Sequence, residues 1–148
     1  MVLQRCGSAL VVVAMTLLAG CAQAGLAQET VSLGGHELRV WTADSPDEQS
    51  RGLSDFDGLA DGEGMLFVFA EPSFPVFGIK DVSFPIEVVF VAEDGRVSAI
   101  EPLSPGESER RVTSDTPSLH AIELPQGWCA GKGVSVGSVL ERDSGVYP

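Results

Sequence analysis

The chain has 148 residues, with 21 acidic against 9 basic side chains and a formal net charge of −12. This charge excludes nucleic-acid binding, because the neutralisation of phosphates needs clustered Lys and Arg side chains. The length suits one domain with a hydrophobic core, and cations, neutral sugars or basic protein patches are more natural partners.

The N-terminus carries one basic residue, Arg5, followed by an apolar run over residues 9–18. The run is shorter than the about 20 residues of a transmembrane helix and has the length of a signal-peptide core. It ends in Leu-Ala-Gly-Cys, which resembles the lipobox of bacterial lipoproteins. The resemblance implies that residues 1–20 are removed and that Cys21 is lipidated. The alternative is an ordinary secretory signal that is cut a few residues further on.

A lipidated Cys21 predicts an exported protein that is anchored to a membrane of the cell envelope, on the periplasmic or outer surface side. Residues 21–30 are small and polar and are expected to form a tether. No second cysteine remains for Cys129, so the fold must be held by its core rather than by a disulfide. We expect a monomer with one folded domain over residues 31–143 and a tail over residues 144–148.

The first elements of the domain have clear signals. Two alternating segments flank Gly34-Gly35 and predict a β-hairpin over residues 31–42. Next, Ser45-Pro46-Asp47-Glu48 combines an N-cap, a proline at the first helical position and a capping-box glutamate. We therefore expect a short helix from Pro46 to Arg51 that ends at Gly52.

The rest of the domain is expected to be built mainly from short strands, separated by turns and one long polar loop over residues 104–117. The strands are expected at residues 64–69, 76–80, 85–92, 96–103, 118–125 and 136–142. Residues 126–133 are expected to add one helical turn. Many short strands with few helices indicate a mostly β barrel or sandwich, a compact single domain with one or two short helices.

Four segments resemble the family called domain of unknown function 192. They are RGL, EGMLFVF, FGIKDVSFPIEVVFVAEDGRV and IELPQGW, which lie in this order between Arg51 and Trp128. The resemblance extends from about Val31 to Glu141. It implies a compact, largely β fold and an exported or tethered protein, and it brings no agreed biochemical activity.

The central segment departs from the pattern of that family. The family usually has Phe-Trp-Met-Lys-Asn-Thr followed by Pro-Leu-Asp, whereas this chain has Gly78 in place of the tryptophan. Asp81 and Glu87 replace the Asn and the Asp, and Lys80 is kept. If the motif forms a site, the resemblance implies a roomier pocket at Gly78 or a weakened function.

The same segment supplies the main candidate site, formed by Lys80, Asp81 and Glu87. Strand alternation places Glu87 on the same face as Val89 and Val91. A buried carboxylate needs a partner, and Lys80 is the nearest basic residue in the sequence. The three charges therefore predict a structural ion pair, simple surface exposure or a ligand-binding cleft.

Two further sets of residues are candidates for binding. Trp41 alternates with polar residues, so it is expected either to form an exposed platform for a ligand or to lie under the loop at residues 104–117. The acidic loop offers carboxylates that could bind Ca²⁺, although their order does not fit an EF-hand. The alternative is that the loop is simply solvated. These acidic residues are Asp55, Asp57, Asp61 and Glu63.

The sequence contains no P-loop, dinucleotide fingerprint or nucleophile elbow. We therefore expect a binding or accessory module without a cofactor, with a small ligand, an envelope polysaccharide or an envelope protein as partner. The competing hypothesis is an envelope hydrolase or transferase that uses Glu87 as acid and base and Lys80 to stabilise charge. A third possibility is an assembly factor with no small ligand.

Overall fold

The computed structural model describes residues 25–143. A hairpin comes first, with β1 over Ala27–Leu33 and β2 over His36–Ala43. Its turn places Gly34 and Gly35 at φ 58° and 82°, a region that glycine adopts without a steric penalty. The predicted hairpin is present, and β1 begins four residues before the expected start of the domain at Val31.

Helix α1 covers Pro46–Arg51 and has the predicted boundaries. The Glu48 backbone N–H donates to Ser45 Oγ, and the Ser45 N–H donates to the Glu48 side chain, which together form a capping box. Gly52 ends the helix at φ 49° and donates its N–H to the Glu48 carbonyl.

Strand β3 spans Glu63–Ser73, β4 Ile86–Ala92, β5 Val97–Leu103 and β6 Ser118–Pro125. The short helix α2 (Trp128–Lys132) and the last strand β7 (Leu140–Arg142) follow. The seven strands form one sheet in the order β5-β4-β6-β3-β2-β1-β7, with β2 and β3 parallel and all other neighbours antiparallel.

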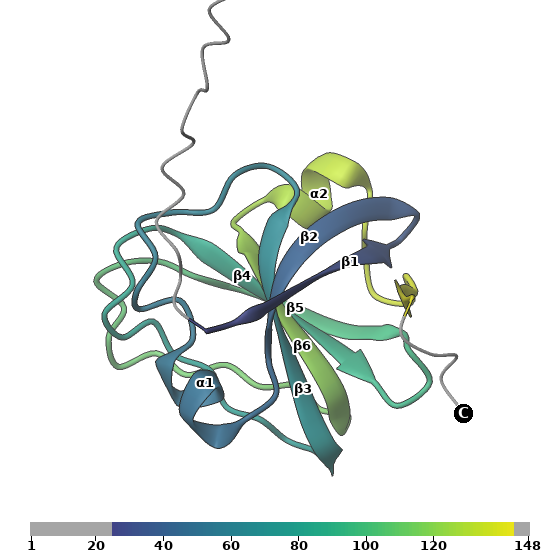
Figure 1. Cartoon of the computed structure of the whole chain (residues 1–148), viewed down its shortest axis with the longest axis horizontal. Helices are drawn as coiled ribbons and strands as arrows, with labels where there is room; N and C mark the ends of the chain where they lie inside the picture. Colours follow the sequence, from purple (N-terminus) through teal and green to yellow (C-terminus); the bar gives the residue numbers. More distant parts are fainter. Residues whose placement is uncertain (1–24, 144–148) are drawn as a thin grey trace, which may run out of the picture.

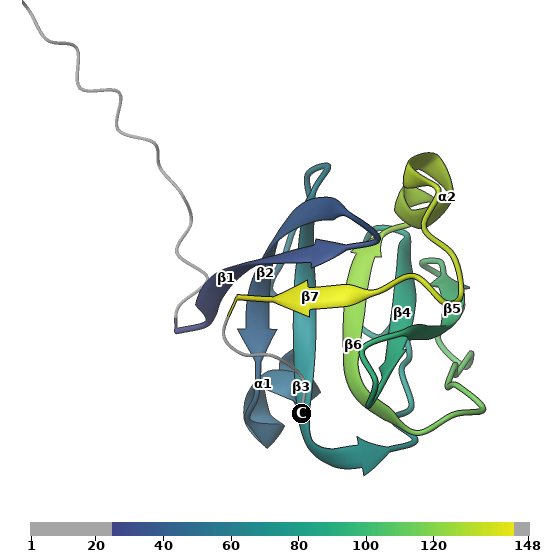
Figure 2. The ribbon, with the colours of Figure 1, turned by 90° about the vertical axis from the view of Figure 1, so that its right-hand side faces the viewer.

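The sheet curls until its two edges approach each other (Figures 1 and 2). The Val97 N–H donates to the Ser138 carbonyl and the Leu140 N–H to the Gly95 carbonyl, both at 2.8 Å. These bonds connect the start of β5 with the segment that leads into β7. Figures 1 and 2 place α1 and α2 at opposite ends of the sheet. The expected mostly β, single-domain fold is confirmed.

The core lies on both faces of the central strands. One cluster inside the curl takes residues from all seven strands and from α2. A second cluster on the other face is rich in aromatic residues and is covered by the segments after α1 and after β3. Because β4 is buried on both faces, its sequence is almost continuously apolar instead of alternating.

The expected strand at residues 76–80 is absent. Phe77 makes a single bridge to Val112, with two backbone hydrogen bonds of 2.9 and 3.0 Å. Asp81 lies at φ 60°, which is uncommon for a residue other than glycine and turns the chain out of any strand. No helix among residues 25–143 is long and apolar enough to cross a membrane.

A candidate binding cleft above a buried carboxyl

A cleft of about 570 Å³ lies between α1, the end of β3 and residues 75–82. The lining combines polar groups of α1 with aromatic side chains and with Gly78, Lys80 and Asp81 of the central motif. Glu123 of β6 also lines it, on the aromatic-rich face of the sheet. The full lining is Gln49, Ser50, Arg51, Gly52, Leu53, Ser54, Phe67, Phe69, Pro75, Val76, Phe77, Gly78, Lys80, Asp81, Val82 and Glu123.

Glu123 is the most unusual group in this cleft. It sits between Met65 of β3 and Val88 of β4, and only 5% of its surface is exposed. Its Oε2 atom is buried and has no hydrogen-bond partner among residues 25–143. Burial in this apolar setting raises the pKa of Glu123 to about 8. At neutral pH the carboxyl is therefore protonated and offers a hydrogen bond to whatever enters the cleft.

The end of α1 closes over this carboxyl. A Cβ atom added at Gly52 would lie 3.8 Å from Glu123 Oε2, which places the end of the helix beside the carboxyl group. The positive φ at Gly52 turns the chain away after this approach. A local capping signal in the sequence thus positions one wall of the cleft.

The other wall is held by the loop over residues 104–117. Arg111 covers Gly78, because a Cβ atom added there would lie 3.0 Å from Arg111 Nη1. Arg111 Nη1 also donates to the carbonyls of Ser108, at 2.7 Å, and Arg110, at 2.8 Å. The space expected to be empty beside Gly78 is therefore occupied by a guanidinium group.

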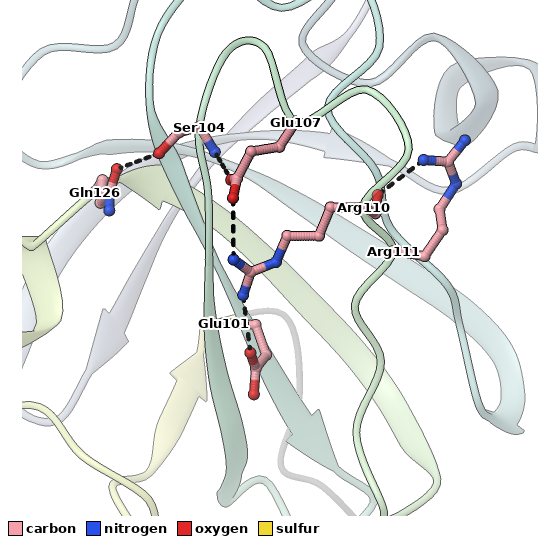
Figure 3. A network of polar contacts seen from close by, with 6 residues as sticks. All are labelled: Glu101, Ser104, Glu107, Arg110, Arg111 and Gln126. Atoms are coloured by element: carbon pink, nitrogen blue, oxygen red, sulfur yellow. Dashed lines mark hydrogen bonds and ion pairs between the residues drawn. The ribbon is translucent and has the colours of Figure 1, made fainter.

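A network of polar contacts fastens this loop to the sheet (Figure 3). Arg110 binds Glu107 at 3.2 Å and Glu101 of β5 at 3.8 Å. Glu107 accepts the Ser104 N–H at 2.8 Å, and Ser104 Oγ donates to Gln126 at 3.3 Å. These contacts connect the loop that carries Arg111 to β5, which precedes the loop, and to Gln126, which follows β6.

Glu87 has a different role from the one expected. It is 5% exposed, and its two oxygens accept the backbone N–H groups of Gly127, at 2.9 Å, and Cys129, at 2.7 Å. It therefore caps the start of α2. Lys80 lines the cleft, Glu87 does not, and no ion pair joins them among residues 25–143. Burial, together with Glu87, also raises the pKa of the Cys129 thiol.

The expectation of an exposed Trp41 is wrong. Trp41 is buried and packs edge-to-face on Phe56, with ring centroids 4.9 Å apart. Phe56, which covers it, belongs to the segment after α1. The alternating pattern of the sequence did not predict this burial, because both faces of β2 are buried near its end.

The acidic loop is used for ion pairs. Asp61 binds Lys132 of α2 at 3.3 Å, and Glu63 pairs with Arg39 and accepts the Ala60 N–H at 3.0 Å. Asp55 and Asp57 stay in the loop after α1, and residues 25–143 contain no cluster of three or more potential metal ligands. The predicted lipidation of Cys21 and removal of residues 1–20 lie outside the described residues.

The sequence interpretation missed two residues of the cleft lining, Glu123 and Arg51, and it missed Arg111, which packs against Gly78. Glu123 had a detectable signal: it is a single acid in an apolar strand, the same signal that drew attention to Glu87. Arg51 was noted as the end of a helix and as part of the RGL segment, but not as a site residue. Arg111 had no signal, because only the folded loop brings it to Gly78.

The fold and the cleft define a class: a small, curled, single-sheet β domain with an open, partly charged cleft on its outer face. The chain belongs to the DUF192 family, described as uncharacterized ACR, whose profile matches residues 29–142. The predicted membership is thereby confirmed. No curated protein matches the chain.

Two solved structures are similar to it. One, from Sinorhizobium meliloti 1021, is described as a candidate transcription regulator. It is 32% identical with a TM-score of 0.74, and the match covers 79% of this chain and 95% of that one. The other, from Novosphingobium aromaticivorans DSM 12444, is described as a protein of unknown function. It is 28% identical with a TM-score of 0.76, over 81% of this chain and 89% of that one.

Proposed function

We propose that this protein is a non-catalytic binding module for a small ligand, which it holds in the cleft above Glu123. One observation carries the proposal: the Glu123 carboxyl, which lines a cleft of about 570 Å³, has a buried oxygen without a hydrogen-bond partner among residues 25–143. Buried polar groups in folded proteins nearly always have partners, and an orphan at a cleft is satisfied when a ligand binds. The cleft volume lies within the usual range for small-molecule sites.

The competing hydrolase or transferase hypothesis loses support from the geometry. It required Glu87 as acid and base, but both Glu87 oxygens accept backbone N–H groups of α2. A nucleic-acid ligand is disfavoured by the net charge of −12. The description of the Sinorhizobium protein as a regulator is therefore not extended to this chain.

We also place the module in the cell envelope, anchored by lipid on Cys21. Ala27, the start of β1, is the sixth residue after Cys21, and even a fully extended chain of that length reaches only about 20 Å. Ala27 pairs with Thr42 at the end of β2, three residues before Ser45 and α1. The anchor would then hold the α1 end of the domain, with its cleft, near the membrane surface.

The test is thermal unfolding of residues 21–148 carrying Cys21→Ser, against metabolites, envelope sugars, peptides and Ca²⁺. A ligand that binds only the folded state raises the midpoint, by about 2.7 kcal/mol of apparent stability at a hundredfold excess over Kd. We expect at least one small-molecule class to do so.

Two tryptophan variants localise any shift. Ser50→Trp fills the cleft from α1, at an exposed serine with no side-chain hydrogen bond. Ser135→Trp makes the same change at an exposed serine outside the cleft. The shift should vanish in the first and persist in the second. A flat panel, or a shift that survives Ser50→Trp, would contradict binding in this cleft.

A further inference from the structure

Basic side chains without an ion pair are concentrated at the cleft. Residues 25–143 contain eight Lys and Arg residues. Five of them bind acidic side chains, namely Arg39, Arg96, Arg110, Lys132 and Arg142. The other three are Arg51 and Lys80, which line the cleft, and Arg111, which covers Gly78 in its wall. The basic side chains that form no ion pair among residues 25–143 of this acidic protein thus lie in or beside this cleft.

We propose that the ligand is a small organic anion that binds with its anionic group between Arg51 and Lys80 and places a neutral hydrogen-bond acceptor against Glu123. This inference rests on the proposed function and names the chemical class of its ligand. The aromatic side chains of Phe67, Phe69 and Phe77 also line the cleft and suit an apolar body of the ligand.

The charges of the cleft lining favour an anion over a cation as the ligand. Arg51 and Lys80 contribute two positive charges to the lining, against the single carboxylate of Asp81 when Glu123 is protonated. The rest of the surface is acidic, so the cleft is where the field favours an anion. A protonated carboxyl is a donor, and an acceptor such as a carbonyl oxygen satisfies it without the cost of burying a charge.

The arrangement predicts how binding depends on pH. The charged groups that line the cleft together with Glu123 are Arg51 from α1 and Lys80 and Asp81 from the motif segment, while Met65 and Val88, which pair with it on β3 and β4, do not titrate. Above about pH 8 Glu123 loses its proton, and with it the hydrogen bond to the ligand. The new carboxylate also repels the anion, so affinity should fall.

The experiment compares matched probes by isothermal titration calorimetry on residues 21–148 with Cys21→Ser. The probes are 4-oxo-4-phenylbutanoate and 4-oxopentanoate, the primary amide and the matching amine of each, and the two carboxylates without the keto group. We expect the keto acids to bind more tightly than their amides and amines, and removal of the keto oxygen to weaken binding.

Four variants assign the contacts. Arg51→Ala and Lys80→Ala should each weaken the keto acids by about fivefold, as expected for a partly exposed ion pair. Lys132→Ala makes the same charge change outside this cleft, at the ion pair with Asp61, and should leave affinity unchanged. Glu123→Gln still donates a hydrogen bond but cannot ionise, so its affinity should not fall above about pH 8.

The outcomes separate this inference from the proposed function. If amides or amines bind best and Ser50→Trp abolishes their binding, the cleft is a ligand site but the anion class is wrong. An equal loss in Lys132→Ala would also overturn the anion contact. If neither these probes nor the wider panel bind, both proposals fail.

Discussion

Two glutamates, Glu87 and Glu123, are each the one acidic residue of an apolar strand, but their hydrogen-bonding surroundings differ. Each is 5% exposed. Glu87 accepts two backbone N–H groups at the start of α2, whereas Glu123 Oε2 accepts none from residues 25–143. Burying a carboxylate without donors costs free energy, so Glu123 keeps its proton instead. The same sequence signal therefore marks a helix cap in one strand and a candidate ligand contact in another.

The Glu123 carboxyl predicts a stability that depends on pH. Its pKa is about 8 in the folded state and 4.5 ordinarily, so between these values the unfolded chain ionises while the folded chain holds its proton. Stability therefore falls as pH rises through this window. Between about pH 5 and about pH 8, the advantage of Glu123→Gln over the natural protein should grow by roughly 3 kcal/mol.

Urea unfolding at several pH values measures this difference. Glu109→Gln is the matched control, because it makes the same chemical change at an exposed site. Parallel stability curves for Glu123→Gln and the natural protein would show that Glu123 is ionised in the fold, and would remove the basis for its role as a donor.

At the scale of elements, α2 depends on a side chain that is distant in sequence. The helix has five residues, and its N-cap, Gly127, has no side chain to bind the first N–H groups. Glu87 of β4 supplies this cap from across the fold. Isolated helices of this length are unstable in water, so α2 requires the contact.

Glu87→Ala should therefore destabilise the protein. It leaves the buried Cys129 N–H and the part-buried Gly127 N–H without their acceptor, at a cost of about 3 kcal/mol. Urea unfolding measures the loss, and Glu109→Ala is the control at an exposed site. Affinity for any cleft ligand should stay unchanged in the fraction that remains folded. Full stability with lost binding would instead return Glu87 to the binding site.

The first strand is fastened by a similar contact. Glu29 of β1 accepts hydrogen bonds from Arg142 Nη2 and Thr42 Oγ1, both at 2.7 Å. Burial opposes ionisation of Glu29, but these partners outweigh it and hold its pKa below the ordinary value. Arg142 also lies 3.2 Å from His120 Nε2, so β1, β2, β6 and β7 meet at one polar cluster. The segment expected to be a tether thus contributes a residue to the fold.

At the scale of the whole molecule, the described chain enters the fold at β1, whose first residue, Ala27, pairs with Thr42 three residues before the cap of α1. Replacing Cys21 with alanine should move the exported protein from the membrane fraction to the soluble fraction, because no acyl chain can attach. Cell fractionation and metabolic labelling with palmitate measure both effects. Cys6→Ala, within the segment expected to be removed, is the control. A Cys21→Ala protein that keeps its label and its membrane fraction would contradict the lipidation.

Much of the fold could be predicted because its signals are local. The Gly34-Gly35 turn and the Ser45 capping box depend on contacts between residues that are close in the chain, so they can be recognised in the sequence. The prediction of a strand at residues 76–80 was wrong, because the positive φ at Asp81 turns the chain and Phe77 makes a single bridge to Val112. Lys80 and Asp81, which the sequence analysis singled out, line the cleft together with Glu123, whereas Glu87 does not.

The sequence by itself determined the class of fold, the boundaries of α1 and the acidic character that disfavours nucleic acid. Only the tertiary structure decided which charges are paired and which face a cleft. The physical reason is that a carboxyl group takes its pKa and its partners from groups that lie far away in the chain. Glu87 meets α2 some 40 residues later, and Glu123 meets the end of α1 through the folding of the whole sheet.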